Sequence, residues 1–146
     1  MVRIIVAGGK DFDDYETLKY SVLHILSDLD RREIVLISLS GIDDNHDKLI
    51  EWISGTADGA DTLGERFAEE YGYEVKRFPA KWMQDGKYNK YAGFERNKEM
   101  AIYASEEGNY GVLIAFWDGE SKGTLNMINN AIKYKMEIHV IKYKKG

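Results

Sequence analysis

Three glycine-containing loops hold the residues best suited to bind an anion. They read Gly-Gly-Lys-Asp-Phe at 8–12, Ser-Gly-Thr-Ala-Asp-Gly-Ala-Asp at 54–61 and Asp-Gly-Glu-Ser-Lys-Gly-Thr at 118–124. Glycines let backbone N–H groups approach a ligand closely, and the start of a helix favours an anion. Each loop follows a predicted strand and precedes a predicted helix, so we expect all three at the sheet edge where open α/β sheets bind ligands. Together they predict a site for a phosphate-bearing ligand.

The third loop has the features of a phosphate cradle. Ser121 can cap the following helix, Gly123 leaves space where an oxyanion would lie, and Thr124 places a hydroxyl beside the free amides of the first helical turn. An ordinary helix cap, with glycines that only shape the loop, would use the same residues. The loops match neither the G-x-x-x-x-G-K-[ST] phosphate-binding pattern nor the G-x-G-x-x-G dinucleotide fingerprint.

Charged residues near these loops could complete the site. Arg96, which is followed by Asn97, is suited to bind a phosphate through two parallel hydrogen bonds, but it could also form a surface ion pair. Asp61 falls in the first turn of its predicted helix, where the helix dipole alone would stabilise a carboxylate. Asp118 ends a predicted strand at the mouth of the expected crevice and could equally cap the next element.

The elements that must position these residues alternate between strand and helix. This alternation predicts an α/β fold of three layers around a doubly wound parallel sheet. Hydrophobic patterns place the strands at 2–7, 49–54, 74–78, 110–117 and 137–141. They place helices at about 14–29, around Leu63, Phe67 and Tyr71, at 93–104 and at 124–134.

Some boundaries rest on weaker signals. Asp13 is the predicted cap of the first helix, because Glu16 follows it by three residues. Two apolar stretches, 34–39 and 49–54, compete for the second core strand, and the glycines after the later stretch favour it. This leaves an inserted strand or hairpin around residues 33–47. The polar and aromatic segment 81–91 is predicted to be a long connection.

The composition limits the chemistry. The 146 residues include no cysteine, which excludes thiol catalysis and cysteine-bound metals. His24, His46 and His139 lack a metal-binding spacing, so we expect no metal and no cofactor beyond a nucleotide-derived ligand. Residues 1–80 carry 17 acidic and 9 basic residues, whereas residues 81–146 carry 8 and 11. This balance disfavours nucleic acid as a partner without excluding it.

Length and hydropathy predict the organisation and location of the chain. A single domain over residues 1–146 is expected from the length. The apolar runs are too short to cross a membrane, and the N-terminus does not resemble a signal peptide, so we expect a cytoplasmic protein that does not bind membranes. Assembly into a homo-oligomer is left open.

Taken in order, the motifs resemble the YspA/YpsA-related branch of the SLOG superfamily. Between the second and third loops the series continues with Phe-Pro-Ala-x-Trp at 78–82 and Ala-Gly-x-x-Arg-Asn-x-x-Met at 92–100, and it ends with Ala-Phe-Trp-Asp-Gly-x-Ser-x-Gly-Thr at 115–124. The resemblance covers nearly the whole chain. It implies a Rossmann-like fold with sheet order 3-2-1-4-5, which binds a nucleotide or nucleotide-derived molecule across the loops of the first, second and fourth strands.

Two relatives of this branch imply different functions. The Lonely Guy phosphoribohydrolases carry a catalytic glutamate three residues after a Gly-Thr, and Met127 occupies that position here. If the chain is such an enzyme, Asp61, Asp118 and Glu120 are the candidates to replace that carboxylate. The DNA-processing protein DprA has similar loops and binds single-stranded DNA, so its resemblance keeps that partner open.

We therefore expect a protein that binds a nucleotide-type small molecule as a sensor, carrier or sequestering protein. Hydrolysis of an N-glycosidic bond in a nucleotide is the first alternative, and binding of single-stranded DNA is the second. The predicted ligand-binding residues are Gly8, Gly9, Lys10, Phe12, Ser54, Gly55, Ala57, Gly59, Asp61, Arg96, Asn97, Asp118, Gly119, Ser121, Gly123 and Thr124.

Overall fold

The computed structural model describes residues 1–34 and 49–144, and at its centre lies a parallel sheet of five strands. Their bounds are Val2–Gly8 (β1), Ile50–Ser54 (β2), Glu74–Arg77 (β3), Tyr110–Trp117 (β6) and Glu137–Lys142 (β7). The strands are ordered β3-β2-β1-β6-β7. Counting only these five strands along the chain, the order is 3-2-1-4-5, so the predicted topology is confirmed. Each strand lies within one residue of its predicted bounds.

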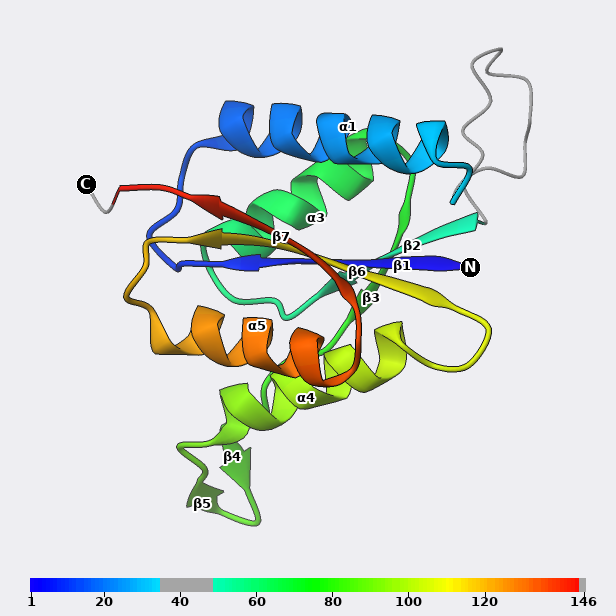
Figure 1. Cartoon of the computed structure of the whole chain (residues 1–146). Helices are drawn as coiled ribbons and strands as arrows, with labels where there is room; N and C mark the ends of the chain where they lie inside the picture. Colours follow the sequence, from blue (N-terminus) through cyan, green and yellow to red (C-terminus); the bar gives the residue numbers. More distant parts are fainter. Residues whose placement is uncertain (35–48, 145–146) are drawn as a thin grey trace.

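Among the described residues, four helices cover the two faces of the sheet. They are Tyr15–Arg31 (α1), Ala60–Glu70 (α3), Ala92–Ala104 (α4) and Lys122–Lys133 (α5). In Figure 1, α1 and α3 lie on one face, and α4 and α5 lie on the other. The predicted three-layer α/β architecture is therefore confirmed.

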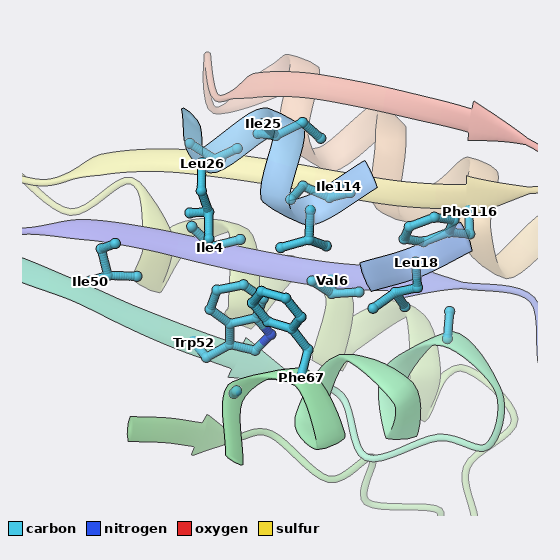
Figure 2. Close-up of a cluster of buried hydrophobic side chains, with 14 of the residues drawn as sticks. Ile4, Val6, Leu18, Ile25, Leu26, Ile50, Trp52, Phe67, Ile114 and Phe116 are labelled. Carbon is cyan, nitrogen blue, oxygen red and sulfur yellow. The ribbon is translucent and has the colours of Figure 1, made fainter. Parts of the chain in front are cut away.

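The central strand β1 supplies both cores because successive side chains of a strand point to opposite faces. Ile4 and Val6 join the core beneath α1 and α3, where Trp52 and Phe67 stack with their ring centroids 5.3 Å apart (Figure 2). Ile5 joins the smaller core beneath α4 and α5. A strand buried on both faces must be apolar throughout, which explains the uninterrupted run at the start of the chain.

The starts of two helices are set by side-chain caps. The cap of α1 is Asp14 and not Asp13, because the carboxylate of Asp14 accepts hydrogen bonds from both the amide and the hydroxyl of Thr17. Ser121 caps α5, as predicted, and its hydroxyl accepts a hydrogen bond from the amide of Thr124. The helix therefore begins at Lys122, two residues earlier than predicted.

The segment predicted as a connection contains a short antiparallel hairpin. Its strands are Met83–Gln84 (β4) and Lys87–Tyr88 (β5). Asp85 and Gly86 form the turn with φ angles of 51° and 76°, and Asp-Gly is a sequence that favours such two-residue turns. In Figure 1 the hairpin projects away from the sheet beside the start of α4.

The inserted strand or hairpin predicted around residues 33–47 falls almost entirely outside the described residues. At the margin of that segment, Ile34 packs against the core beneath α1. In the part of the chain that the structure describes, no helix is long and apolar enough to span a bilayer.

Substitution of Gly64 should test the close approach of α3 to the sheet. A Cβ at Gly64 would lie 2.8 Å from Cβ of Val6, so we expect Gly64→Ala to lower the free energy of unfolding by about 1–3 kcal/mol. Gly123→Ala is the matched control, because a Cβ there meets no atom within 4 Å and should cost no stability. Urea unfolding measures both, and equal stabilities would contradict the tight packing.

Candidate functional site

A cavity of about 450 Å³ lies at the carboxyl edge of the sheet, between the glycine loops and the start of α4. A volume of this size lies in the range of small-molecule sites. The predicted ligand-binding residues that line it are Gly8, Lys10, Ala57, Asp61, Arg96, Asn97, Ser121, Gly123 and Thr124. The fold thus brings residues from all three loops and from α4 to the same cavity.

Other predicted site residues hold the loops together and do not line the cavity. The carbonyl of Gly9 accepts a hydrogen bond from the amide of Ala60 at 3.2 Å, which joins the first two loops. Gly59 has a φ angle of 78°, and a Cβ there would lie 2.2 Å from this carbonyl oxygen. Only glycine fits such a position. Gly9 and Gly59 therefore fix the distance between the two loops.

Phe12 and Ser54 are also occupied in building the loops. The Phe12 side chain is only 3% exposed, and its ring stacks on Phe116 with centroids 4.8 Å apart. The hydroxyl of Ser54 donates to the carboxylate of Glu65 at 2.7 Å and accepts from the amide of Thr56 at 3.0 Å. Both residues lie beneath the site surface, where they support its shape.

Gly55 allows a cation and a carboxylate to meet at the centre of the site. The guanidinium of Arg96 donates from Nη1 to the carbonyl of Gly55. A Cβ at Gly55 would lie 2.6 Å from this Nη1 and 2.8 Å from Oδ2 of Asp61. A larger residue would thus displace both charged groups. The glycine is required by the close approach of these side chains.

Asp61 is buried and has an altered acidity. Its side chain is 5% exposed, and one carboxylate oxygen accepts a hydrogen bond from the amide of Ala57 at 3.1 Å. Burial raises the pKa of Asp61 from 3.8 to about 6, although the Ala57 amide and the charge of Arg96 oppose this rise. The carboxylate is therefore ionised at neutral pH and takes up a proton in mildly acidic solution.

The charges around the cavity favour an anion. Among the residues that the structure describes, Lys10, Lys90 and Arg96 line it together with two carboxylates, Asp11 and Asp61. Burial lowers the pKa of Arg96, and the nearby Asp61 carboxylate raises it. The carboxylate of Asp11 accepts a hydrogen bond from the Tyr143 hydroxyl at 2.6 Å. These five side chains therefore carry one more positive than negative formal charge.

Asn97 connects α4 to the third loop. Its side-chain amide donates to the carbonyl of Gly123 at 3.2 Å and to Oδ1 of Asn126 at 3.0 Å. Its own Oδ1 accepts from Nε of Arg96 at 3.0 Å. The Arg-Asn pair therefore orients the guanidinium and fixes the start of α5 relative to α4.

The third loop is folded by its own side chains. One oxygen of Asp118 accepts from the amides of Glu120 and Ser121, both at 2.8 Å. Gly119 takes a positive φ angle of 88° in this turn, and Glu120 is exposed. None of Asp118, Gly119 and Glu120 lines the cavity, so among the three candidate carboxylates only Asp61 does.

Several lining residues are not among the predicted ligand-binding residues. They are Ala7, Asp11, Trp82, Lys90, Gly93, Phe94, Met100 and Met127. Met127, at the position of the Lonely Guy glutamate, is buried and faces the cavity. The sequence shows that residues 82–94 are rich in aromatic side chains. It does not show which of these rings line the cavity. Among residues 1–34 and 49–144, no cluster of side chains could hold a metal ion.

The pH dependence of stability should reveal the buried carboxylate of Asp61. Because its pKa is raised on folding, the folded protein binds more protons than the unfolded chain between about pH 4 and pH 6. Ionisation of Asp61 therefore lowers the free energy of unfolding as the pH rises through this range. The loss is up to about 3 kcal/mol for a pKa rise from 3.8 to about 6.

We expect Asp61→Asn to be more stable than the unchanged protein at pH 7.5 and to lose this advantage at pH 4. Urea unfolding at several pH values measures the difference. Asp58→Asn, which removes an exposed carboxylate from the same loop, is the matched control. A difference that does not vary with pH would contradict this account of Asp61.

Comparison with known proteins places the chain in a family. The family model YAcAr, described as the YspA, cpYpsA-related SLOG family, matches residues 2–84, from β1 through β4. Neither the curated proteins nor the solved structures gave a match. Membership of a SLOG family suggests nucleotide-related binding or processing. With its five-stranded parallel sheet and a match over more than half of its length, the chain belongs to the YspA, cpYpsA-related SLOG family and has a Rossmann-like fold.

Proposed function

We propose that this protein binds a nucleotide or a nucleotide-derived small molecule, as a sensor, carrier or sequestering protein. The observation that carries the proposal is that Arg96 and residues of all three glycine loops line the same cavity. Two of these loops lead directly into α3 and α5, whose first-turn amides lack partners within the helix. Helix starts and a guanidinium both favour an anion, and a phosphate satisfies both.

The phosphate is proposed to lie beside the start of α5. A Cβ at Gly123 would meet no atom within 4 Å, so the backbone there is accessible from the cavity. Thr124 adds a hydroxyl to the same wall. Nη1 and Nε of Arg96 are held by Gly55 and Asn97, whereas Nη2 has no hydrogen-bond partner among the residues described. This last group is the donor proposed to contact the phosphate.

Asp61 is proposed to accept a hydrogen bond from a ribose hydroxyl. Its carboxylate lines the cavity and is bonded to one backbone amide, so further acceptor sites on its oxygens are available. Asp118 fits this role less well, because it lies outside the lining and folds its own loop. A phosphate at α5 and a ribose at α3 would span the cavity between the two helix starts.

Thermal unfolding with candidate ligands tests the proposal. Mono-, di- and cyclic nucleotides and ADP-ribose are added at increasing concentration, and a ligand at a hundredfold its dissociation constant should stabilise the protein by about 2.7 kcal/mol. Gly123→Glu should abolish the stabilisation, because it adds bulk and negative charge to the proposed phosphate position.

Leu125→Glu is the matched control for that variant. Leu125 lies in the same turn of α5, is exposed and does not line the cavity, so the same charge is added outside the site. We expect Leu125→Glu to respond to ligands as the unchanged protein does. Normal binding by Gly123→Glu would place the phosphate elsewhere, and no response to any nucleotide would refute the proposed function.

A second candidate function is hydrolysis of the N-glycosidic bond of a nucleotide. It is favoured by the buried Asp61, whose pKa of about 6 suits a group that exchanges a proton near neutral pH. Such a carboxylate could activate water for addition at C1′ of the ribose while the base departs. Met127 weighs against this function, because it provides no carboxylate at the corresponding position.

Chromatography after incubation with nucleotides separates the two functions. A hydrolase should release free base and ribose phosphate, and Asp61→Asn should stop the release while thermal unfolding shows that the variant is folded. Asp118→Asn is the comparison, since Asp118 lies outside the cavity lining and its loss should leave the rate measurable. The absence of product, together with ligand-induced stabilisation, would support binding without hydrolysis.

A further inference from the structure

Two aromatic side chains line the cavity and are partly exposed instead of packing in a core. Trp82 and Phe94 both line the cavity, yet their exposed fractions are 41% and 42%. In contrast, Trp52 of β2 and Phe67 of α3 are completely buried in the core between the sheet and α3. A partly exposed tryptophan in a cavity wall leaves a large flat apolar surface for a ligand.

The Trp82 ring is held in place by its surroundings. It precedes the β4–β5 hairpin, and its carbonyl accepts a hydrogen bond from the amide of Asn89 at 2.6 Å, which closes the hairpin. The rings of Trp82 and Tyr88 are nearly parallel, with an interplanar angle of 11° and centroids 6.1 Å apart. Figure 1 shows that this hairpin projects from the body of the fold, so the sheet core does not explain its aromatic residues.

Gly93 brings this ring next to the proposed phosphate-binding cation. A Cβ at Gly93 would lie 3.3 Å from Cη2 of Trp82 and 3.8 Å from Nη2 of Arg96. The indole and the free end of the guanidinium therefore flank the same residue at the start of α4. A ligand that places an anion on Arg96 has an aromatic wall within reach of its remaining atoms.

We propose that Trp82, together with Phe94, is a specificity-determining residue that stacks on the base of the ligand. This inference rests on the proposed function, and it restricts the ligand to molecules that carry a planar heterocycle as well as a phosphate. Stacking on an aromatic ring is available to every base, because each has a π face. The wall therefore selects nucleotides over sugar phosphates, and the loops supply the phosphate contacts.

Isothermal titration with AMP and with ribose 5-phosphate tests this role of Trp82. The two probes share the sugar phosphate and differ in the base. The variants are Trp82→Ala, Trp82→Phe and, as the control, Met83→Ala, which truncates an exposed neighbour on the same hairpin outside the cavity lining. Tryptophan fluorescence of the unchanged protein and of Trp82→Phe provides a second readout.

We expect the unchanged protein to bind AMP more tightly than ribose 5-phosphate. Trp82→Ala should weaken AMP binding by about 5- to 150-fold and leave ribose 5-phosphate unaffected. Trp82→Phe should retain most of the affinity for AMP, and Met83→Ala should retain all of it. AMP should also change the fluorescence of the unchanged protein, and Trp82→Phe should lose this change.

Three results would overturn the inference, and they are distinguishable from each other. If Trp82→Ala binds AMP normally, the base lies elsewhere and the phosphate site stands. If the variant loses both probes equally, Trp82 supports the structure of the site and does not select the base. If the unchanged protein binds neither probe, the proposed phosphate site fails for monophosphates, and the stacking role fails with it.

Discussion

The parallel direction of all five strands is the constraint on which the site depends. β1 pairs with β2 on one side and β6 on the other, and both pairs are parallel. The loops that follow these three strands must therefore emerge at one edge, and the helices that follow β2 and β6 must begin there. Three helix starts, those of α3, α4 and α5, have residues in the cavity lining or directly beside it. An antiparallel sheet would have sent these loops to opposite edges.

Glycine fixes the spacing within this arrangement at two points. At Gly59 a side chain would collide with the backbone of the first loop, and at Gly55 it would collide with the charged groups of Arg96 and Asp61. Burial of these groups costs free energy, which is partly offset by their mutual attraction and by backbone hydrogen bonds. The two charged groups lie beside a cavity, and residues with shifted pKa values are common in binding sites.

The sequence was sufficient to predict the strand bounds and the meeting of the glycine loops, because these follow from hydrophobic period and chain direction, whereas the sheet order was predicted from the resemblance to the SLOG branch. It was less informative about individual roles. Gly9 and Asp118 satisfy backbone groups inside the loops, and such geometry is set by three-dimensional packing. The β4–β5 hairpin carried a recognisable Asp-Gly turn, but its short strands lack the alternation that identifies longer ones. The bond from Asn97 to Gly123 joins residues 26 positions apart and has no local signal.

The end of the family match at residue 84 divides the cavity lining between two parts of the chain. The segment that matches the family contributes the first two loops and Trp82, whereas the guanidinium of Arg96 and the helix start at Gly123 come from the remainder of the chain. A polypeptide cut after residue 84 would keep the glycines of both early loops and lose the cation between them. The complete cavity wall therefore forms only when the two parts of the chain fold against each other.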